Sequence, residues 1–244
     1  MKLNICHLYP DVLNLYGDTG NITCLRQRIL WRGIGVEITQ LPIGAQADFS
    51  RFDLFFIGGG QSFEQGLIMD DLRSGKADEI KAAVEDEKVV LAVCGGYQIL
   101  GRFFRTHSGE QFDFIGAIDI HTIGSDERMI GNYMFSCAED SGGATIVGFE
   151  NHSGKTYLGE GVSPLGKVMT GFGNNGEDGT EGARYKNVFG TYCHGPLLPK
   201  NPKFADFIIK TALERRYPNA ELVMETLDDS LELKAHHYMQ NRLK

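Results

Sequence analysis

Cys94 stands at a point in the sequence where a nucleophile could be presented. The apolar residues 89–93 predict a buried strand, Gly95 and Gly96 follow the cysteine, and residues 97–100 begin a helical pattern. A strand, a sharp turn and a helix form the nucleophile elbow of many hydrolases, and a helix N-terminus favours thiolate over thiol. The alternative is a buried structural cysteine, but the agreement of strand, glycines and helix favours a nucleophile.

Two other predicted strands end in residues that such a nucleophile needs. The glycines 58–60 follow the apolar run 53–57, and His194 follows the apolar run 188–193. The carboxyl ends of parallel strands lie along one edge of a sheet. We therefore expect these distant segments to meet there.

The chemistry of this group is that of acyl transfer. His194 is the expected base for Cys94, and the backbone N–H groups of Gly60 and Gly95 are the expected oxyanion hole. Attack of the thiolate on an amide or ester would give a tetrahedral intermediate and then a thioester, which water hydrolyses.

Other reactive residues carry weaker signals. His152 lies in a glycine-bounded loop and is a second candidate, whereas Cys193 should face away from His194 into the core because neighbouring strand residues point to opposite faces. The five cysteines are scattered without a CxxC pair, which indicates reduced thiols and no zinc site. The segment NHSGKT lacks the first glycine of a P-loop, since Phe149 occupies that position.

Composition excludes several classes of protein. The chain has 244 residues, 42% of them hydrophobic and 23% charged, with a net charge of −8 that argues against nucleic-acid binding. No apolar run approaches the roughly 20 residues that span a bilayer, and the N-terminus lacks the apolar segment of a signal peptide. We expect a cytoplasmic protein.

The predicted elements form an α/β fold with a mostly parallel central sheet and helices on both faces. After residue 104, glycine-separated short strands indicate a more antiparallel middle section, followed by a loop-rich stretch and two helices. Asp18, Thr19 and Asn21 are candidate caps of the first helix. We expect one domain over residues 1–217, with residues 218–244 as its helical C-terminal extension. The expected strands are 3–8, 36–41, 53–57, 89–93, 112–121, 128–137, 144–149 and 188–193, and the expected helices are 22–31, one beginning at 62, 78–87, 202–217 and 231–243.

Several of these motifs resemble a known family. Residues 94–98, CGGYQ, resemble the C-x-G-x-Q nucleophile motif of class I (triad-type) glutamine amidotransferases, and Gly58–Gly60 and His194 resemble their oxyanion loop and catalytic histidine. The blocks at 14–21, 148–152 and 192–196 resemble the cobyric-acid-synthase-like (CobB/CobQ-like) branch, and the blocks at 14–21 and 171–175 are the more specific parts of the resemblance. The resemblance covers residues 3 to about 217. It implies a flavodoxin-like class I glutamine amidotransferase fold and the release of ammonia from L-glutamine.

Within this branch, the chain most resembles separate glutaminase subunits that work as heterodimers. The resemblance implies a Mur-ligase-like, ATP-dependent synthetase partner that amidates the D-glutamate α-carboxyl of lipid II to D-isoglutamine during peptidoglycan synthesis. ATP and metal are then expected on the partner, with no cofactor in this chain and no membrane insertion, and the complex would act at the inner face of the cytoplasmic membrane. The alternatives are the glutaminase part of a cobyrinate or cobyric acid amidase and a non-catalytic glutamine-binding subunit.

The resemblance also assigns substrate-binding residues and leaves one catalytic group open. A substrate-binding arginine is implied in the middle region, where Arg128 can grip the α-carboxylate of glutamine, and Gln98 and Gly59 are the other expected binding residues. A solvated surface arginine and an exposed helix residue are the plain alternatives for Arg128 and Gln98. The class I triad places a Glu two residues after the histidine, but this chain has Pro196 there. We expect an acidic residue of the partner, or a distant one such as Glu150, to orient His194.

A second departure from the class I motif is small. Class I motifs usually have glycine two residues before the cysteine, and this chain has Ala92.

Overall fold

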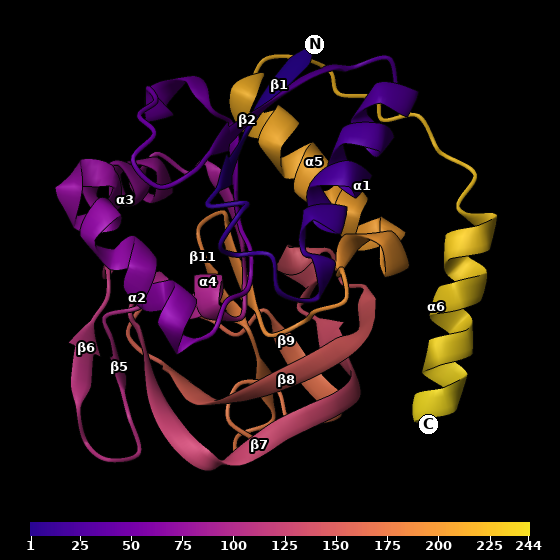
Figure 1. Ribbon diagram of the computed structural model, residues 1–244. Helices are drawn as coiled ribbons and strands as arrows, with labels where there is room; N and C mark the ends of the chain where they lie inside the picture. The colour runs from indigo at the N-terminus through magenta and orange to yellow at the C-terminus, as the bar shows by residue number, and fades with distance from the viewer.

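The central sheet of the computed structural model runs through the middle of the molecule (Figure 1). The structure describes residues 1–244, apart from the side chain of residue 62. The six strands of this sheet lie in the order β11-β12-β4-β3-β1-β2, and every pairing is parallel except that of β11 with β12. The parallel strands β2-β1-β3-β4-β12 have the flavodoxin-like order. The strands are β1 (Lys2–Leu8), β2 (Gly35–Leu41), β3 (Leu54–Ile57), β4 (Val89–Val93), β11 (Ala183–Tyr185) and β12 (Val188–Thr191).

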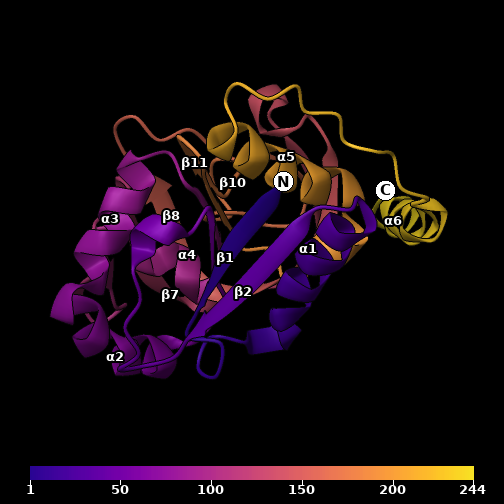
Figure 2. The same ribbon diagram turned by 90° about the horizontal axis from the view of Figure 1, so that it is seen from above.

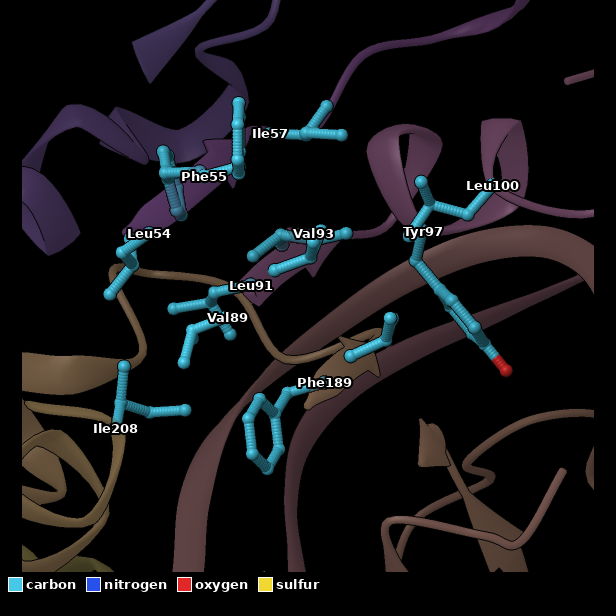
Figure 3. Packing of buried hydrophobic residues seen from close by; sticks show 14 of the residues in the cluster. Leu54, Phe55, Ile57, Val89, Leu91, Val93, Tyr97, Leu100, Phe189 and Ile208 are labelled. Atoms are coloured by element: carbon cyan, nitrogen blue, oxygen red, sulfur yellow. The ribbon is translucent and has the colours of Figure 1, made fainter. Parts of the chain in front are cut away.

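Helices cover both faces of this sheet, as the sequence predicts. Seen from above, α2 and α3 lie on one face and α1 and α5 on the other (Figure 2). Every residue of β3 and β4 is therefore buried, which explains why these strands read as continuous apolar runs. Their side chains pack with Tyr97, Phe189 and Ile208 (Figure 3). The helices are α1 (Thr19–Trp31), α2 (Ser62–Asp71), α3 (Ala77–Glu85), α4 (Gly95–Ile99) and α5 (Pro202–Arg216).

A second sheet forms the lower part of the molecule in Figure 1. Its pairings are antiparallel except for that of β5 with β7, which agrees with the predicted antiparallel section. The long hairpin of β7 and β8 has a bulge between Gly124 and Met129. The strands are β5 (Phe103–Arg105), β6 (Gln111–Asp113), β7 (Ile120–Cys137), β8 (Thr145–Leu158), β9 (Gly166–Thr170) and β10 (Thr180–Glu181).

In this region two predicted strands have wrong bounds, and one stretch predicted as loops contains strands. The predicted strand 112–121 is divided between β6 and the start of β7, and the predicted strand 128–137 is only the second half of β7, which continues through the bulge. The stretch 154–182 contains the end of β8 and all of β9 and β10, although the sequence predicts loops there. Glycines and charged residues at the bulge and in these exposed strands hide the alternation of apolar residues.

The two sheets are joined where the site lies. An isolated antiparallel bridge pairs Phe149 of β8 with His194, which follows β12, and one apolar cluster contains Tyr133 and Ile146 of the second sheet together with Phe189 of the first. The position of His194 therefore depends on both sheets.

The C-terminal helix α6 (Ser230–Leu243) stands at the side of the molecule (Figure 1). The buried Arg28 of α1 donates to Asp206 of α5 and to Asp229, which directly precedes α6. His236 of α6 is hydrogen-bonded through its Nδ1 atom to the carbonyl of Lys200 (2.9 Å). Among the described residues, no helix combines the length and the apolar character needed to cross a membrane.

Candidate active site

Cys94 occupies a strained turn at the carboxyl end of β4. Its φ of 47° and ψ of −108° lie where residues other than glycine rarely occur, and α4 begins at the next residue. The turn is held by a hydrogen bond from the amide of Cys94 to the carbonyl of Thr191 (2.8 Å). Strain of this kind is typical of a nucleophile elbow, so Cys94 has the predicted setting of a nucleophile.

The glycines beside Cys94 allow the elbow to touch the glycine loop that follows β3. A Cβ atom on Gly96 would stand 2.6 Å from the carbonyl oxygen of Gly58, and one on Gly95 would collide with the carbonyl of Gly60. The absence of these side chains lets the elbow and the glycine loop pack backbone to backbone, so Gly60 and Gly95 lie directly against each other. Their predicted oxyanion role stays a prediction, with this proximity in its favour.

His194, which follows β12, is fully buried. Its backbone amide donates to the carbonyl of Phe149 (2.8 Å), which fixes the residue between the two sheets. Its Nδ1 atom is 3.8 Å from Oδ1 of Asp18, an ion-pair distance that is too long for a hydrogen bond. Neither ring nitrogen has a hydrogen-bond partner among the described residues.

Asp18 is the functional residue that the sequence analysis missed. Expected only as a possible helix cap, it makes no side-chain cap bond to α1; its Oδ2 atom instead accepts a hydrogen bond from the amide of Gly59 (2.7 Å), and its side chain is fully buried. Pro196, in place of the usual glutamate, packs on Gly20 of the same helix. The carboxylate beside His194 thus comes from the start of α1.

Glu150, a candidate acidic residue to orient His194, does not lie against that histidine. Its two carboxylate oxygens accept hydrogen bonds from the amides of Phe172 (2.8 Å) and Gly173 (2.9 Å), and its nearest histidine contact is with His152 at 3.8 Å. Within this chain, the expected acidic partner of His194 is therefore Asp18. The sequence signal that could have found it is the block at 14–21, which contains Asp18 and is among the most family-specific parts of the sequence.

The charges around His194 favour its protonated form. Burial lowers the pKa of His194, but the neighbouring Cys94 and Asp18 raise it by more, to about 10. An imidazolium beside a thiolate is the usual state of a cysteine nucleophile with its histidine.

Gly59 lies against Asp18, His194 and Cys94. Its amide donates to Asp18 and its carbonyl accepts from the amide of Leu15 (3.1 Å). A Cβ atom at this position would stand 2.7 Å from Cε1 of His194 and 3.5 Å from Cβ of Cys94. Both of its backbone groups are bonded within the protein, so Gly59 supports Asp18, and its contact with substrate stays a prediction.

A pocket of about 140 Å³ brings four of the predicted residues together: Cys94, Gly60, Gln98 and Arg128. A pocket of this size suits a single amino acid better than a larger ligand. A larger cavity, of about 370 Å³, lies between α1 and α6 and contains none of the predicted site residues. The lining of the smaller pocket also includes Leu15, Tyr16, Gln61, Gln65, Phe104, Asn151, His152, Ser153 and Gly154.

Gln98 is held by the protein on both sides of its amide. Its Oε1 atom accepts a hydrogen bond from Gln65 (2.9 Å), and its Nε2 atom donates to the hydroxyl of Tyr192 (2.9 Å). One N–H and one lone pair remain for a ligand. Its predicted contact with glutamine stays a prediction, and its evident role is to fix the wall of the pocket.

Arg128 lies at the bulge of β7, the position from which a strand can turn a side chain toward a site. The residue is exposed, but its Nε atom donates to Oδ1 of Asn151 (2.6 Å), and both residues line the pocket. This position agrees with the binding role of Arg128, which stays a prediction.

His152 and Cys193 are buried and support the site. The His152 ring stacks on Tyr192 with a centroid separation of 3.6 Å, and its Nδ1 atom is 2.9 Å from the carbonyl oxygen of Gly154. Cys193 is fully buried against Gly148, and burial raises the pKa of its thiol. Cys193 therefore points into the core, as expected.

Comparison with known proteins identifies the family of the chain. The CobB/CobQ-like glutamine amidotransferase domain matches residues 4–202. The chain belongs to this family. The predicted resemblance to the cobyric-acid-synthase-like branch is thereby confirmed.

The relatives differ in how much of their length the chain covers. The chain is 40% identical to the lipid II isoglutaminyl synthase (glutamine-hydrolyzing) subunit GatD of Staphylococcus aureus (strain N315), over 99% of this chain and 96% of the relative. It is 36% identical to a probable cobyric acid synthase of Methanothermobacter thermautotrophicus, over 64% of this chain but only 32% of that protein.

The fold is also found among solved structures. A glutamine amidotransferase from Thermotoga maritima superposes with a TM-score of 0.56 at 14% sequence identity, covering 99% of this chain and 93% of that one. Together with the order of the parallel strands, this confirms the predicted class I glutamine amidotransferase fold.

Proposed function

We propose that this chain is the glutaminase subunit of a lipid II isoglutaminyl synthase. It hydrolyses L-glutamine to glutamate and supplies ammonia for amidation of the D-glutamate α-carboxyl of lipid II, a step of peptidoglycan synthesis. The observation that carries the proposal is the meeting of Cys94, His194 and Asp18 at Gly59, beside a pocket of amino-acid size. The near full-length similarity to GatD supports the choice of pathway.

The first half of the reaction follows from the arrangement of the charged groups. The thiolate of Cys94 attacks the side-chain carboxamide carbon of glutamine, and the amides of Gly60 and Gly95 donate hydrogen bonds to the oxyanion. The imidazolium of His194 gives its proton to the departing nitrogen, which leaves as ammonia when the C–N bond breaks. The product is a thioester on Cys94.

In the second half, water attacks the thioester. The neutral imidazole of His194 takes a proton from that water, and the thiolate of Cys94 leaves as the C–S bond breaks. Glutamate is released and the imidazolium–thiolate pair is restored. Asp18 stabilises the imidazolium and fixes its orientation in both halves, the task of the third member of a triad.

The use of ammonia requires a partner subunit. Ammonia becomes ammonium in bulk water at neutral pH and loses its nucleophilicity, so an activated carboxylate has to be close. We propose a heterodimer with a Mur-ligase-like, ATP-dependent synthetase that carries the ATP and metal sites. The complex would work in the cytoplasm, at the inner face of the membrane that holds lipid II.

The test is glutamate release from L-glutamine by the purified chain, alone and co-expressed with a Mur-ligase-like subunit. We expect hydrolysis that rises with the partner and is lost in Cys94→Ala, and amidated lipid II only when ATP and both subunits are present. Hydrolysis with amidation of a cobyrinate instead would contradict the proposed pathway. Binding of glutamine without turnover in every combination would show a non-catalytic subunit.

A further inference from the structure

A chain of hydrogen bonds links Arg128 to the loop that follows β1. Nε of Arg128 donates to Oδ1 of Asn151 (2.6 Å), and Nδ2 of Asn151 donates to the hydroxyl oxygen of Tyr16. Arg128 and Asn151 come from the two strands of the β7–β8 hairpin, whereas Tyr16 lies 135 residues from Asn151 in the sequence. The contact thus connects the second sheet to the carboxyl edge of the first.

The direction of these bonds is set by chemistry. A guanidinium can only donate, so the carbonyl end of the Asn151 amide has to face Arg128 and its NH₂ end has to face Tyr16. Tyr16 then accepts, which leaves its own hydroxyl proton to be donated elsewhere. Arg128 uses only its Nε atom in this chain of bonds, so its two terminal NH₂ groups take no part in it. The hydroxyl of Tyr16 and the terminal NH₂ groups of Arg128, two residues that line the pocket, therefore remain available as donors.

Tyr16 is held in a conformation that local structure does not favour. Its φ of 57° is left-handed, in the short turn Leu15–Gly17. In this conformation its ring makes T-shaped contacts with the rings of His194 and Phe149, with centroid separations of 5.0 Å and 5.5 Å. The strained turn thus places Tyr16 in the lining of the pocket, with its ring against that of the catalytic histidine.

We propose that Tyr16 and Asn151, with Arg128, recognise the α-carboxylate of glutamine: Arg128 and the hydroxyl of Tyr16 donate to it, and Asn151 positions both. This inference rests on the proposed glutaminase function and adds two residues to its specificity. The carboxamide of the same glutamine lies at Cys94, which lines the same pocket as Arg128, Asn151 and Tyr16. A free amino acid is then preferred to one whose α-carboxyl is blocked.

The test compares L-glutamine with its α-amide, which has no carboxylate, as substrates of the full chain with its partner. Tyr16→Phe keeps the ring over His194 and removes the hydroxyl. We expect it to raise KM for L-glutamine about tenfold with kcat within about twofold, since a hydrogen bond to a charged group is worth roughly this factor or more. KM for the α-amide should not change.

Two further variants complete the comparison. Asn151→Asp places a carboxylate against Arg128, and we expect an even larger increase in KM for L-glutamine because it competes with the substrate for the guanidinium. Tyr157→Phe is the matched control, because the hydroxyl of Tyr157 bonds Glu177 at an exposed site outside the pocket. We expect it to behave as the wild type with both substrates.

The outcomes separate this inference from the proposed function. If the wild type hydrolyses L-glutamine but Tyr16→Phe has an unchanged KM, or a KM raised equally for both substrates, the inference is wrong and the glutaminase function stands. If the wild type does not hydrolyse glutamine and the Cys94→Ala chain does not bind it by calorimetry, both are wrong. Thermal melting of each variant identifies a change that comes only from misfolding.

Discussion

The side chains of Asp18, His194 and Cys94 pack around Gly59. Its amide holds Asp18, and the side of its Cα atom where a side chain would begin faces His194 and Cys94. The close approach of three polar groups around one residue is possible because that residue has no Cβ atom. The residue scale therefore gives three predictions, two about charge and one about space.

The first prediction concerns Asp18→Asn. Because Cys94 also raises the pKa of His194, loss of the carboxylate should lower this pKa from about 10 only part of the way toward the roughly 6.5 of a free imidazole. We expect kcat to fall by about a hundredfold or more. The amide oxygen of Asn can still accept from Gly59, so the loop should keep its position. NMR titration of His194 measures the pKa, and an unchanged midpoint would show that Asp18 does not act on the histidine.

The same pKa shift predicts the pH dependence of stability. Because the folded pKa of His194 lies above that of the unfolded chain, protonation of His194 stabilises the fold. This contribution is complete below about pH 6.5 and is lost as the pH rises through about 10. Urea unfolding at pH 6 and pH 9 should therefore show a larger decrease in stability for the wild type than for His194→Gln. Equal decreases would argue against a raised pKa.

The third prediction concerns Gly59→Ala. The new Cβ atom would stand 2.7 Å from Cε1 of His194, so the imidazole has to move, and we expect glutaminase activity to fall more than a hundredfold, since small misplacements at a reacting centre are costly. Gly66→Ala is the matched control because nothing lies within 4 Å of its added Cβ atom. Activity equal to that of the control would mean that His194 tolerates displacement.

Three local structures do most of the positioning at the scale of elements. The elbow after β4 presents Cys94, the glycine loop after β3 holds the start of α1, and the bulge of β7 carries Arg128 next to Asn151 of β8. The helices fix these parts through their packing. In particular, α1 carries Asp18 at its start and the buried Arg28 further along, so the attachment of α1 to α5 also holds the carboxylate that lies beside His194.

The fourth prediction tests this attachment. Arg28→Met leaves Asp206 and Asp229 with fewer partners, and we expect a loss of about 2 kcal/mol in the free energy of unfolding, less than for a fully buried pair because both carboxylates are partly solvated. The exposed Arg26→Met is the control. Urea unfolding measures the loss, and limited proteolysis should release α6 earlier in the variant. Identical stability of the two variants would contradict the assigned role.

At the scale of the whole molecule, the candidate active site lies between the two sheets. The first sheet supplies Cys94 and the segment that ends in His194, while the second supplies Arg128 and Asn151 and pairs with His194 through Phe149. The segment after α5 contributes none of the residues that line the pocket. It contacts α1 through Arg28 and the second sheet through β7, β8 and Thr170 of β9.

The fifth prediction follows from the absence of pocket residues in the segment after α5. A chain ending at residue 217 lacks Asp229 and α6, so its Arg28 keeps Asp206 but loses one partner. We expect a lower Tm by several degrees, in proportion to the loss of about 1–2 kcal/mol, and unchanged hydrolysis of L-glutamine. Loss of activity at a temperature where the shortened chain is folded would show that residues 218–244 belong to the glutaminase unit in function.

The sequence by itself determined the parts whose signals are local. The elbow at Cys94, the glycines at 58–60 and the strand before His194 each follow from a few neighbouring residues, and the parallel sheet follows from alternating apolar strands and helices. The parallel arrangement then brings the ends of these strands to one edge, which is why Cys94 and His194 could be paired before the structure was known.

Only the tertiary structure decided which carboxylate serves His194 and where Arg128 points. Asp18 meets Gly59 across 41 residues of chain, and capping preferences by themselves do not distinguish it from an ordinary helix cap. Arg128 depends on a bulge that arises from the pairing of β7 with β8. Periodicity and capping preferences describe contacts within a few residues, whereas these contacts form when the loops after β1 and β3 and the second sheet pack against one another, and their specificity comes from that packing.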